Sequence, residues 1–485
     1  MTQTLHIFRK DIRRFRYELC AVAALTAAFA WSHIAADVPG PADFGRAMAL
    51  SFLTTFFLAG AWWFLVSQLI HEESLAGDRQ FWATRPYAWR SLLAAKLLFV
   101  IAFVNVPLLA AQVAILAAAG YRPLAGIPQL LWMQFAVAAI LLAPAFALGT
   151  VTRNLAQFVL TILGGVLSWY VALAAVVPYQ AIAVPWQSQA VSVTVVCAGA
   201  ALMVGWQFSR RWTTASIRAG LCTLLLAGVL YYGLPMPVRD AIRSSVFHQA
   251  EAKAVSVSIP LLNALGYGHD SGSGRLGINL RFTIHCVPEG EVARPEMLDV
   301  TLEAPAGLRW SPGPEFASRE FPVSTPAARE TNYIHTLYLP REFYRGVQGA
   351  AVTVHGSMRL SLRQQTIVPL PHGQAARIPG GGYCDISQAQ DQSTVFCSSP
   401  FRRPFDTSSG SGVDVDHGPA GFARYSRTQL LSAPESPFPD FAVSPVFTIQ
   451  MTSTPIDVET SLVRESPRAW IERDFAASVR MPVEH

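Results

Sequence analysis

Seven long apolar runs in the first 236 residues limit this chain to folds that contain a helical membrane domain. A helix needs about 20 mostly apolar residues to cross the hydrocarbon core of a bilayer. The runs cover residues 17–36, 47–70, 92–119, 128–151, 155–177, 189–208 and 219–234. We therefore predict a transmembrane domain of about seven helices over 17–236, after a cytoplasmic segment over 1–16.

The charges of this half predict its orientation. It carries 15 Lys and Arg against 7 Asp and Glu, although the whole chain has a formal net charge of only +5. With a cytoplasmic N-terminus, 13 of these 15 basic residues fall in cytoplasmic segments, and only Arg46 and Arg122 fall outside. Because positive residues favour the cytoplasmic side, we expect seven crossings that place residues 237–485 outside the cytoplasm.

The N-terminal segment has the pattern of an amphipathic helix. Its apolar residues recur at helical spacing, and they are Phe8, Ile12, Phe15 and Leu19. The basic residues lie on other faces, and they are Arg9, Lys10, Arg13 and Arg16. Such a helix is expected to lie in the headgroup plane of the inner leaflet. The plainer interpretation, a basic anchor before the first span, is compatible with it.

The second half, 237–485, reads as an all-β domain. Short runs in which apolar and polar residues alternate lie between turn residues, which is typical of half-buried strands. They cover 255–259, 277–286, 297–302, 333–339, 351–362 and 446–451. We predict an extracytoplasmic domain of β-sandwich type, with one or two lobes. The segment 401–419, rich in Ser, Gly and Asp, is expected to be a loop.

Three of the six cysteines lie in this outer domain, where oxidation is permitted. Cys384 and Cys397 are close in sequence, and we favour a disulfide between them, which leaves Cys286 unpaired. The alternative is three buried thiols, and geometry decides between the two.

Several kinds of chemistry are missing from the sequence. The three lysines are Lys10, Lys96 and Lys253, and none follows a glycine, so a P-loop for ATP is excluded. The sequence has no HExxH zinc motif, no CxxC pair and no GxSxG elbow. We therefore expect no catalytic site, no metal site and no cofactor in this chain. The small net charge argues against nucleic acid as a partner.

The most informative segment is the cytoplasmic loop after the second run. It concentrates aromatic and arginine side chains, which are favoured anchors in protein interfaces. The candidate docking residues are Glu72, Glu73, Gly77, Asp78, Arg79, Phe81, Trp82, Arg85 and Pro86. A short helix over 72–82 would carry them. The plainer interpretation is an aromatic belt with positive charge on the cytoplasmic side.

Residues 73–86, ESLAGDRQFWATRP, followed by SLLAAKL over 91–97, resemble the corresponding loop of bacterial ABC transporter permeases of the type-two exporter class. In that family an N-terminal elbow helix precedes the first span, which is similar to residues 6–16 here. The loop after the second span holds the coupling helix that contacts the ATPase subunit, at about 72–82 in this chain. Short outer helices between the fifth and sixth spans correspond to residues 178–186.

The resemblance implies the permease subunit of an ATP-driven exporter in the bacterial cytoplasmic membrane. It also implies a second permease protomer and a separate ABC ATPase that binds ATP and magnesium. It covers about residues 1–210, and the seventh span and the outer domain depart from the family. The alternative hypothesis is a membrane-anchored binding or scaffold protein whose outer domain engages an envelope partner.

Overall fold

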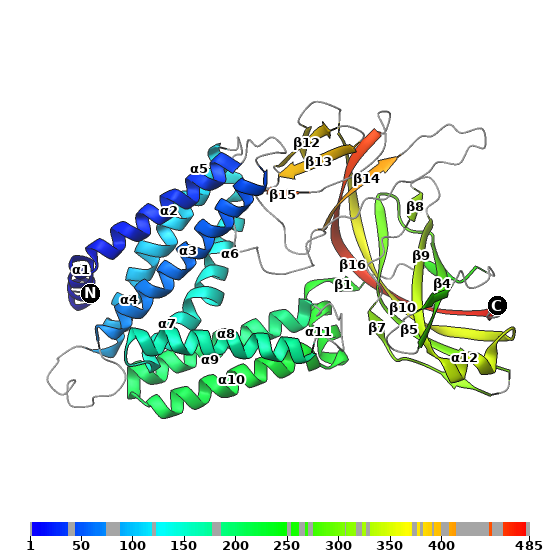
Figure 1. The fold of residues 1–485 in the computed structure, drawn as a ribbon, viewed down its shortest axis with the longest axis horizontal. Helices are drawn as coiled ribbons and strands as arrows, with labels where there is room; N and C mark the ends of the chain where they lie inside the picture. The colour runs from blue at the N-terminus through cyan, green and yellow to red at the C-terminus, as the bar shows by residue number, and fades with distance from the viewer. Residues whose placement is uncertain are drawn as a thin grey trace. The chain divides into compact units, whose positions relative to one another are not determined.

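The structure is a computed structural model with a helical first half and a β-rich second half (Figure 1). It describes residues 2–36, 44–73, 88–118, 123–176, 186–249, 254–260, 267–269, 275–305, 307–316, 323–325, 330–370, 376–378, 382–389, 392–398, 407–413, 446–448 and 459–481. The chain divides after Arg239 into two compact units, with 368–404 and 410–461 grouped with the first.

Apolar runs of the first unit form helices because their backbone groups bond within each segment. The helices are α1 Thr2–Arg14, α2 Arg16–Ala36, α3 Phe44–His71, α4 Trp89–Val100, α5 Val106–Ala118, α6 Ile127–Ala136, α7 Ala143–Val151, α8 Leu155–Val176, α9 Trp186–Arg210 and α10 Thr213–Gly233. A π-helical segment, η2 (Ile101–Asn105), joins α4 to α5, and another, η4 (Val137–Leu142), joins α6 to α7. A short 3₁₀ helix, η3 (Pro123–Gly126), precedes α6.

Six helices among the described residues are long and apolar enough to cross a membrane, whereas the sequence predicted about seven. They cover Arg16–Ile34, Phe52–His71, Trp89–Ala118, Leu130–Val151, Trp186–Arg210 and Thr213–Gly233. The difference is α8. Its apolar part with described side chains, Leu155–Ser168, is shorter than a span. Asn154 caps the start of α8, because its side chain accepts the N–H of Gln157 at 2.8 Å.

The helices pack in pairs that bring distant segments together. In the first unit α2 packs on α3 and α5, α3 packs on α7, and α7 packs on α9. The tightest pair is the hairpin of α9 and α10. Gly199 lies so close to Thr223 that an added Cβ would be 2.3 Å from its side chain. Ser192 donates to the carbonyl of Ala227 at 2.9 Å in the same hairpin.

Both π-helical segments end two residues before a proline, Pro107 or Pro144. Proline lacks an N–H, so a carbonyl in the preceding turn loses its donor. Neighbouring helices supply donors in η4. Trp63 Nε1 donates to the carbonyl of Leu141 at 3.0 Å, and Cys197 Sγ donates to that of Ala139 at 3.3 Å. The prolines that the sequence placed in these spans therefore change the helical hydrogen-bond pattern.

The residues of the second half that the structure describes form three sheets. The seven-stranded sheet has the order β1-β16-β10-β5-β6, with β14 on β16 and β7 on β5. Its strands are β1 His248–Gln249, β5 Glu291–Glu303, β6 Arg309–Trp310, β7 Glu315–Phe316, β10 Ala351–Leu370, β14 Thr407–Val413 and β16 Glu459–Arg480. The five-stranded sheet has the order β2-β4-β9-β8, with β3 on β4. Its strands are β2 Ser256–Ser258, β3 Tyr267–His269, β4 Arg275–His285, β8 Val323–Thr325 and β9 Glu330–Pro340.

A third, four-stranded sheet has the order β11-β12-β13-β15. Its strands are β11 Ala376–Ile378, β12 Gly382–Ala389, β13 Gln392–Ser398 and β15 Val446–Thr448. All six strand runs predicted from the alternation of residues overlap observed strands.

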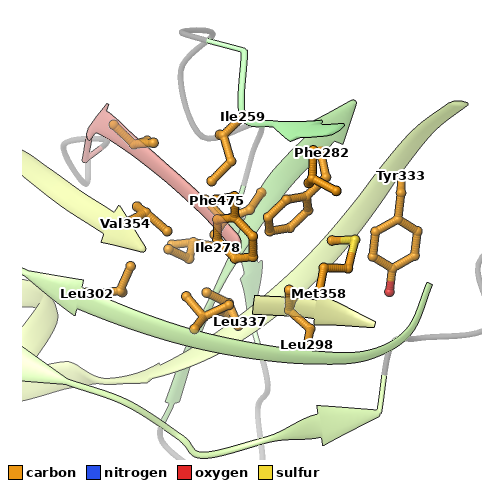
Figure 2. Packing of buried hydrophobic residues seen from close by; sticks show 14 of the residues in the cluster. Ile259, Ile278, Phe282, Leu298, Leu302, Tyr333, Leu337, Val354, Met358 and Phe475 are labelled. Carbon is orange, nitrogen blue, oxygen red and sulfur yellow. The ribbon is translucent and has the colours of Figure 1, made fainter. Parts of the chain in front are cut away.

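Alternating side chains of the two larger sheets form one hydrophobic core in the second unit (Figure 2). Ile278 and Phe282 of β4 point into it, as do Val354 of β10 and Phe475 of β16. The Phe282 and Phe475 rings meet edge to face with centroids 5.2 Å apart. The two sheets are open, and they share this one hydrophobic core.

Two expectations for the second half were wrong. The predicted loop over 401–419 contains a strand, β14, because its Ser- and Gly-rich residues pair with the long strand β16. The half is also not purely β, since it contains α12 (Arg341–Val347) and the greater part of α11 (Met236–Val246). Helix α11 is held on the seven-stranded sheet by ion pairs of Asp240 with Arg359 and of Arg243 with Glu296.

Candidate functional site at the flanks of the 74–87 segment

The predicted docking residues fall into two groups. Glu72 and Glu73 form a turn after α3 and are described by the structure. The other seven lie outside the described residues, and they are Gly77, Asp78, Arg79, Phe81, Trp82, Arg85 and Pro86. Of the short outer helices expected over 178–186, residues 178–185 also lie outside them, and Trp186 begins α9. The candidate site is therefore built from the two ends of the loop.

A buried ion cluster joins both ends of the loop to the N-terminal helix. Lys96, in the second turn of α4, places its Nζ 2.8 Å from Asp11 Oδ2 of α1 and 3.4 Å from Glu73 Oε1. Lys10 Nζ lies 3.3 Å from the same Glu73 oxygen. The side chains of Lys96 and Asp11 are 0% exposed and that of Glu73 is 2% exposed. We call these four residues the ion cluster.

The apolar face of α1 packs against protein. Phe8 and Phe15 both contact Phe99 of α4, with ring centroids 6.4 and 6.0 Å apart, and Ile7 is buried beside them. The sequence pattern predicted this apolar face. Phe99 of α4 and Phe103 of η2 cover it with an apolar surface of their own. As a result, α1 and α4 are bound through both their aromatic rings and the Asp11–Lys96 pair.

Burial controls the titration of this region. The pKa of Asp11 is raised because its carboxylate is removed from water, and the nearby Lys96 opposes this shift only in part. Oδ1 of Asp11 has no hydrogen-bond partner among the described residues. Burial also lowers the pKa of Arg211, in the turn between α9 and α10, to about 10, while Glu73 opposes the shift. Arg211 therefore stays charged at neutral pH, and its charge interacts favourably with that of Glu73.

A second polar contact fixes the same end of the helical unit. His71 Nε2, at the end of α3, lies 2.9 Å from the Thr152 hydroxyl after α7. The 74–87 segment thus begins beside a helix end that is tied to both α1 and α7.

A chain of carboxamides joins the third and fourth spans farther along. Asn105 Nδ2 donates to Gln134 Oε1 at 3.1 Å, and Gln134 Nε2 donates to Gln112 Oε1 at 2.8 Å. Gln112 and Gln134 are buried. These neutral polar side chains therefore hydrogen-bond helix to helix, as is common for amide side chains within membrane spans.

Sequence reasoning missed Asp11 and Lys96 as partners. A signal was present for each. Asp11 is the one acid in a basic helix, and it lies four residues from both Ile7 and Phe15, on the face that is buried. Lys96 lies inside an apolar run, where an ionisable side chain requires a partner.

The register of the four-stranded sheet places Cys384 of β12 directly opposite Cys397 of β13. Directly opposite residues in antiparallel strands have Cα atoms about 4.5–5.5 Å apart, a separation that a disulfide can bridge. Cys286 is free and exposed after β4. The disulfide itself stays a prediction.

Within the described ranges, no three His, Cys, Asp or Glu residues lie together in a way that could hold a metal ion. The described residues of this site form ion pairs and the contact of His71 with Thr152, which are suited to positioning helices.

Comparisons with known proteins assign no family. No protein-family model matches the sequence, and no curated protein matches it. Among solved structures, red sea bream transglutaminase aligns with 53% of this chain at 10% identity, with a TM-score of 0.13. The match covers 35% of the transglutaminase chain. A similarity this low carries no argument about function.

Proposed function

We propose that this chain is the permease subunit of an ATP-driven ABC exporter, with a separate ATPase subunit docked on the 71–91 loop. The observation that carries the proposal is the ion cluster. It fixes both flanks of the loop, Glu73 before it and Lys96 after it, to the same helix α1. A soluble partner that pushes on this loop would therefore act on α1, α3 and α4 together.

The residue content of the membrane half supports the need for such a partner. The chain has no Gly-Lys-Ser/Thr motif for nucleotide phosphates. Work for transport must then come from another subunit, in which ATP and magnesium bind. Two permease protomers with two ATPase subunits is the arrangement that we propose.

The proposal includes a membrane topology. Six helices of spanning length and the 22-residue α8 give seven crossings if α8 also spans. At about 1.5 Å per residue, α8 is long enough for a core of about 30 Å. The N-terminus then lies in the cytoplasm and the β-rich half lies outside. We assign this half a sandwich type, from the shared core of its two larger sheets.

The test is co-purification from native membranes in mild detergent. We expect an ATPase with a P-loop to co-purify with the wild-type chain. The double variant Trp82→Ala/Arg85→Ala should bind this ATPase more weakly, because aromatic and Arg anchors dominate interfaces. The matched control, Trp31→Ala/Arg309→Ala, removes one exposed tryptophan and one exposed arginine away from the loop and should keep the ATPase.

Two results would contradict the proposal. If the loop variant and the control retain the ATPase equally, the loop is not the docking element. If no ATPase co-purifies with the wild-type chain, the permease assignment fails, and the scaffold hypothesis for the outer domain takes its place.

A further inference from the structure

We infer that the loop-flank end of the helical unit binds the headgroups of anionic phospholipids through a set of exposed arginines. This inference rests on a membrane location, and it does not depend on the ATPase partner. It starts from α1. Because α4 covers the apolar face of α1, the helix meets its surroundings with its opposite face. That face carries Arg9 and Arg13, and Arg16 begins α2 just after it; all three arginines are exposed.

Three arginines at this end lie over aromatic rings. Arg16 lies 4.5 Å from the ring centre of Tyr17, Arg90 lies 5.4 Å from that of Trp89, and Arg210 lies 4.9 Å from that of Trp212. All six of these side chains are exposed, and each pair lies at the end of a helix. Trp and Tyr are enriched at the level of lipid headgroups, where an amphipathic ring has one wet and one apolar side.

The three pairs belong to the same end of the unit because each adjoins the ion cluster. Arg16 follows α1, which holds Lys10 and Asp11, and Trp89 begins α4, which holds Lys96. Arg210 precedes Arg211, which interacts electrostatically with Glu73. We call these three pairs, with Arg9 and Arg13, the arginine belt.

The acids near the belt that the structure describes are buried or half-buried, and Glu72, whose side chain is 30% exposed, lies 3.8 Å from Arg14, which is not part of the belt. Among the described residues up to 239, no Asp or Glu is exposed. The single acid of α1, Asp11, is buried against Lys96. The ion cluster therefore removes the acid that would otherwise neutralise the belt. An arginine guanidinium binds phosphate through two parallel hydrogen bonds, so the belt is complementary to phosphodiester headgroups.

The experiment uses the full chain in detergent, titrated with short-chain phosphatidylglycerol or phosphatidylcholine and followed by native mass spectrometry. We expect tighter binding of phosphatidylglycerol. Each arginine removed should weaken it by about fivefold, so that Arg9→Gln/Arg13→Gln/Arg16→Gln loses on the order of a hundredfold. Far-UV circular dichroism checks that the variant is folded.

The matched control removes three exposed arginines from the second unit, as Arg309→Gln/Arg341→Gln/Arg345→Gln, and should leave binding unchanged. Unchanged affinity of the belt variant for phosphatidylglycerol would overturn the inference. Equal affinity of the wild type for phosphatidylcholine would also overturn it, as would displacement of the lipid by inorganic phosphate at equal concentration. None of these results bears on whether an ATPase docks on the loop.

Discussion

Replacing Lys96 by Met should destabilise the protein strongly, because it leaves Asp11 charged and buried without its partner. Both side chains are 0% exposed, so solvent screening does not reduce the effect. Breaking a buried ion pair by removing one member costs about 3–5 kcal/mol of the free energy of unfolding. The same substitution removes only one of the two cationic partners of Glu73, since Lys10 still lies 3.3 Å from it. The assay is denaturant unfolding of the purified chain in micelles, followed by tryptophan fluorescence.

The matched control is Lys10→Met, which removes the same charge from a side chain that is 40% exposed. Lys10 is largely solvated and Glu73 keeps Lys96 at 3.4 Å, so this variant should stay within about 1 kcal/mol of the wild type. The double variant Lys96→Met/Asp11→Asn removes the orphaned charge and should recover much of the loss. If Lys96→Met unfolds like Lys10→Met, or if Asp11→Asn brings no recovery, the ion cluster is not the stabilising contact described here.

The Lys96→Met variant should also respond to pH in a defined direction. The pKa of Asp11 is raised in the folded wild type by burial, and Lys96 is the largest influence that lowers it. Without Lys96 the folded-state pKa rises further, so the fold binds a proton more readily than the unfolded chain. Stability then increases as the pH falls. We expect the difference in the free energy of unfolding from the wild type to narrow as the pH falls.

Two further predictions concern the cysteines and the topology. Under non-reducing conditions a thiol reagent should modify Cys286 but spare Cys384 and Cys397, which react only after reduction. A disulfide between these two residues stabilises the fold by about 3 kcal/mol. Prompt modification of all three cysteines would exclude the disulfide. In spheroplasts a membrane-impermeant maleimide should modify Cys286, which the proposed topology places outside. In an Ala88→Cys variant the new cysteine should be modified only after lysis, because residue 88 is expected in the cytoplasm. Labelling of both positions in intact spheroplasts would mean that α8 does not cross.

Local patterns predicted the elements of both halves well. The four residues Ile278, Leu280, Phe282 and Ile284 alternate along β4 and are all buried, as the period of two requires. Strand β14 was missed because Ser and Gly have low strand propensity and its partner lies far along the chain. Pairing with β16, a tertiary effect, decides its structure.

The candidate site was only half predictable. The loop attracted attention through its own residues, but the partners of its flanks are distant, since Asp11 and Lys96 are separated by 85 positions. The apolar face of α1 was visible in the sequence, whereas the surface that covers it was not. A helical periodicity shows that a face is apolar, and it does not distinguish lipid from a neighbouring helix.

The π-helical segments η2 and η4 have a consequence for the orientation of the third and fourth spans. A π turn contains one residue more than an α turn, and each residue of an α-helix advances the helix by about 100°. The part of each span after its π turn is therefore rotated by about that angle relative to a regular helix. A wheel drawn through either whole span would assign half of its side chains to the wrong neighbour.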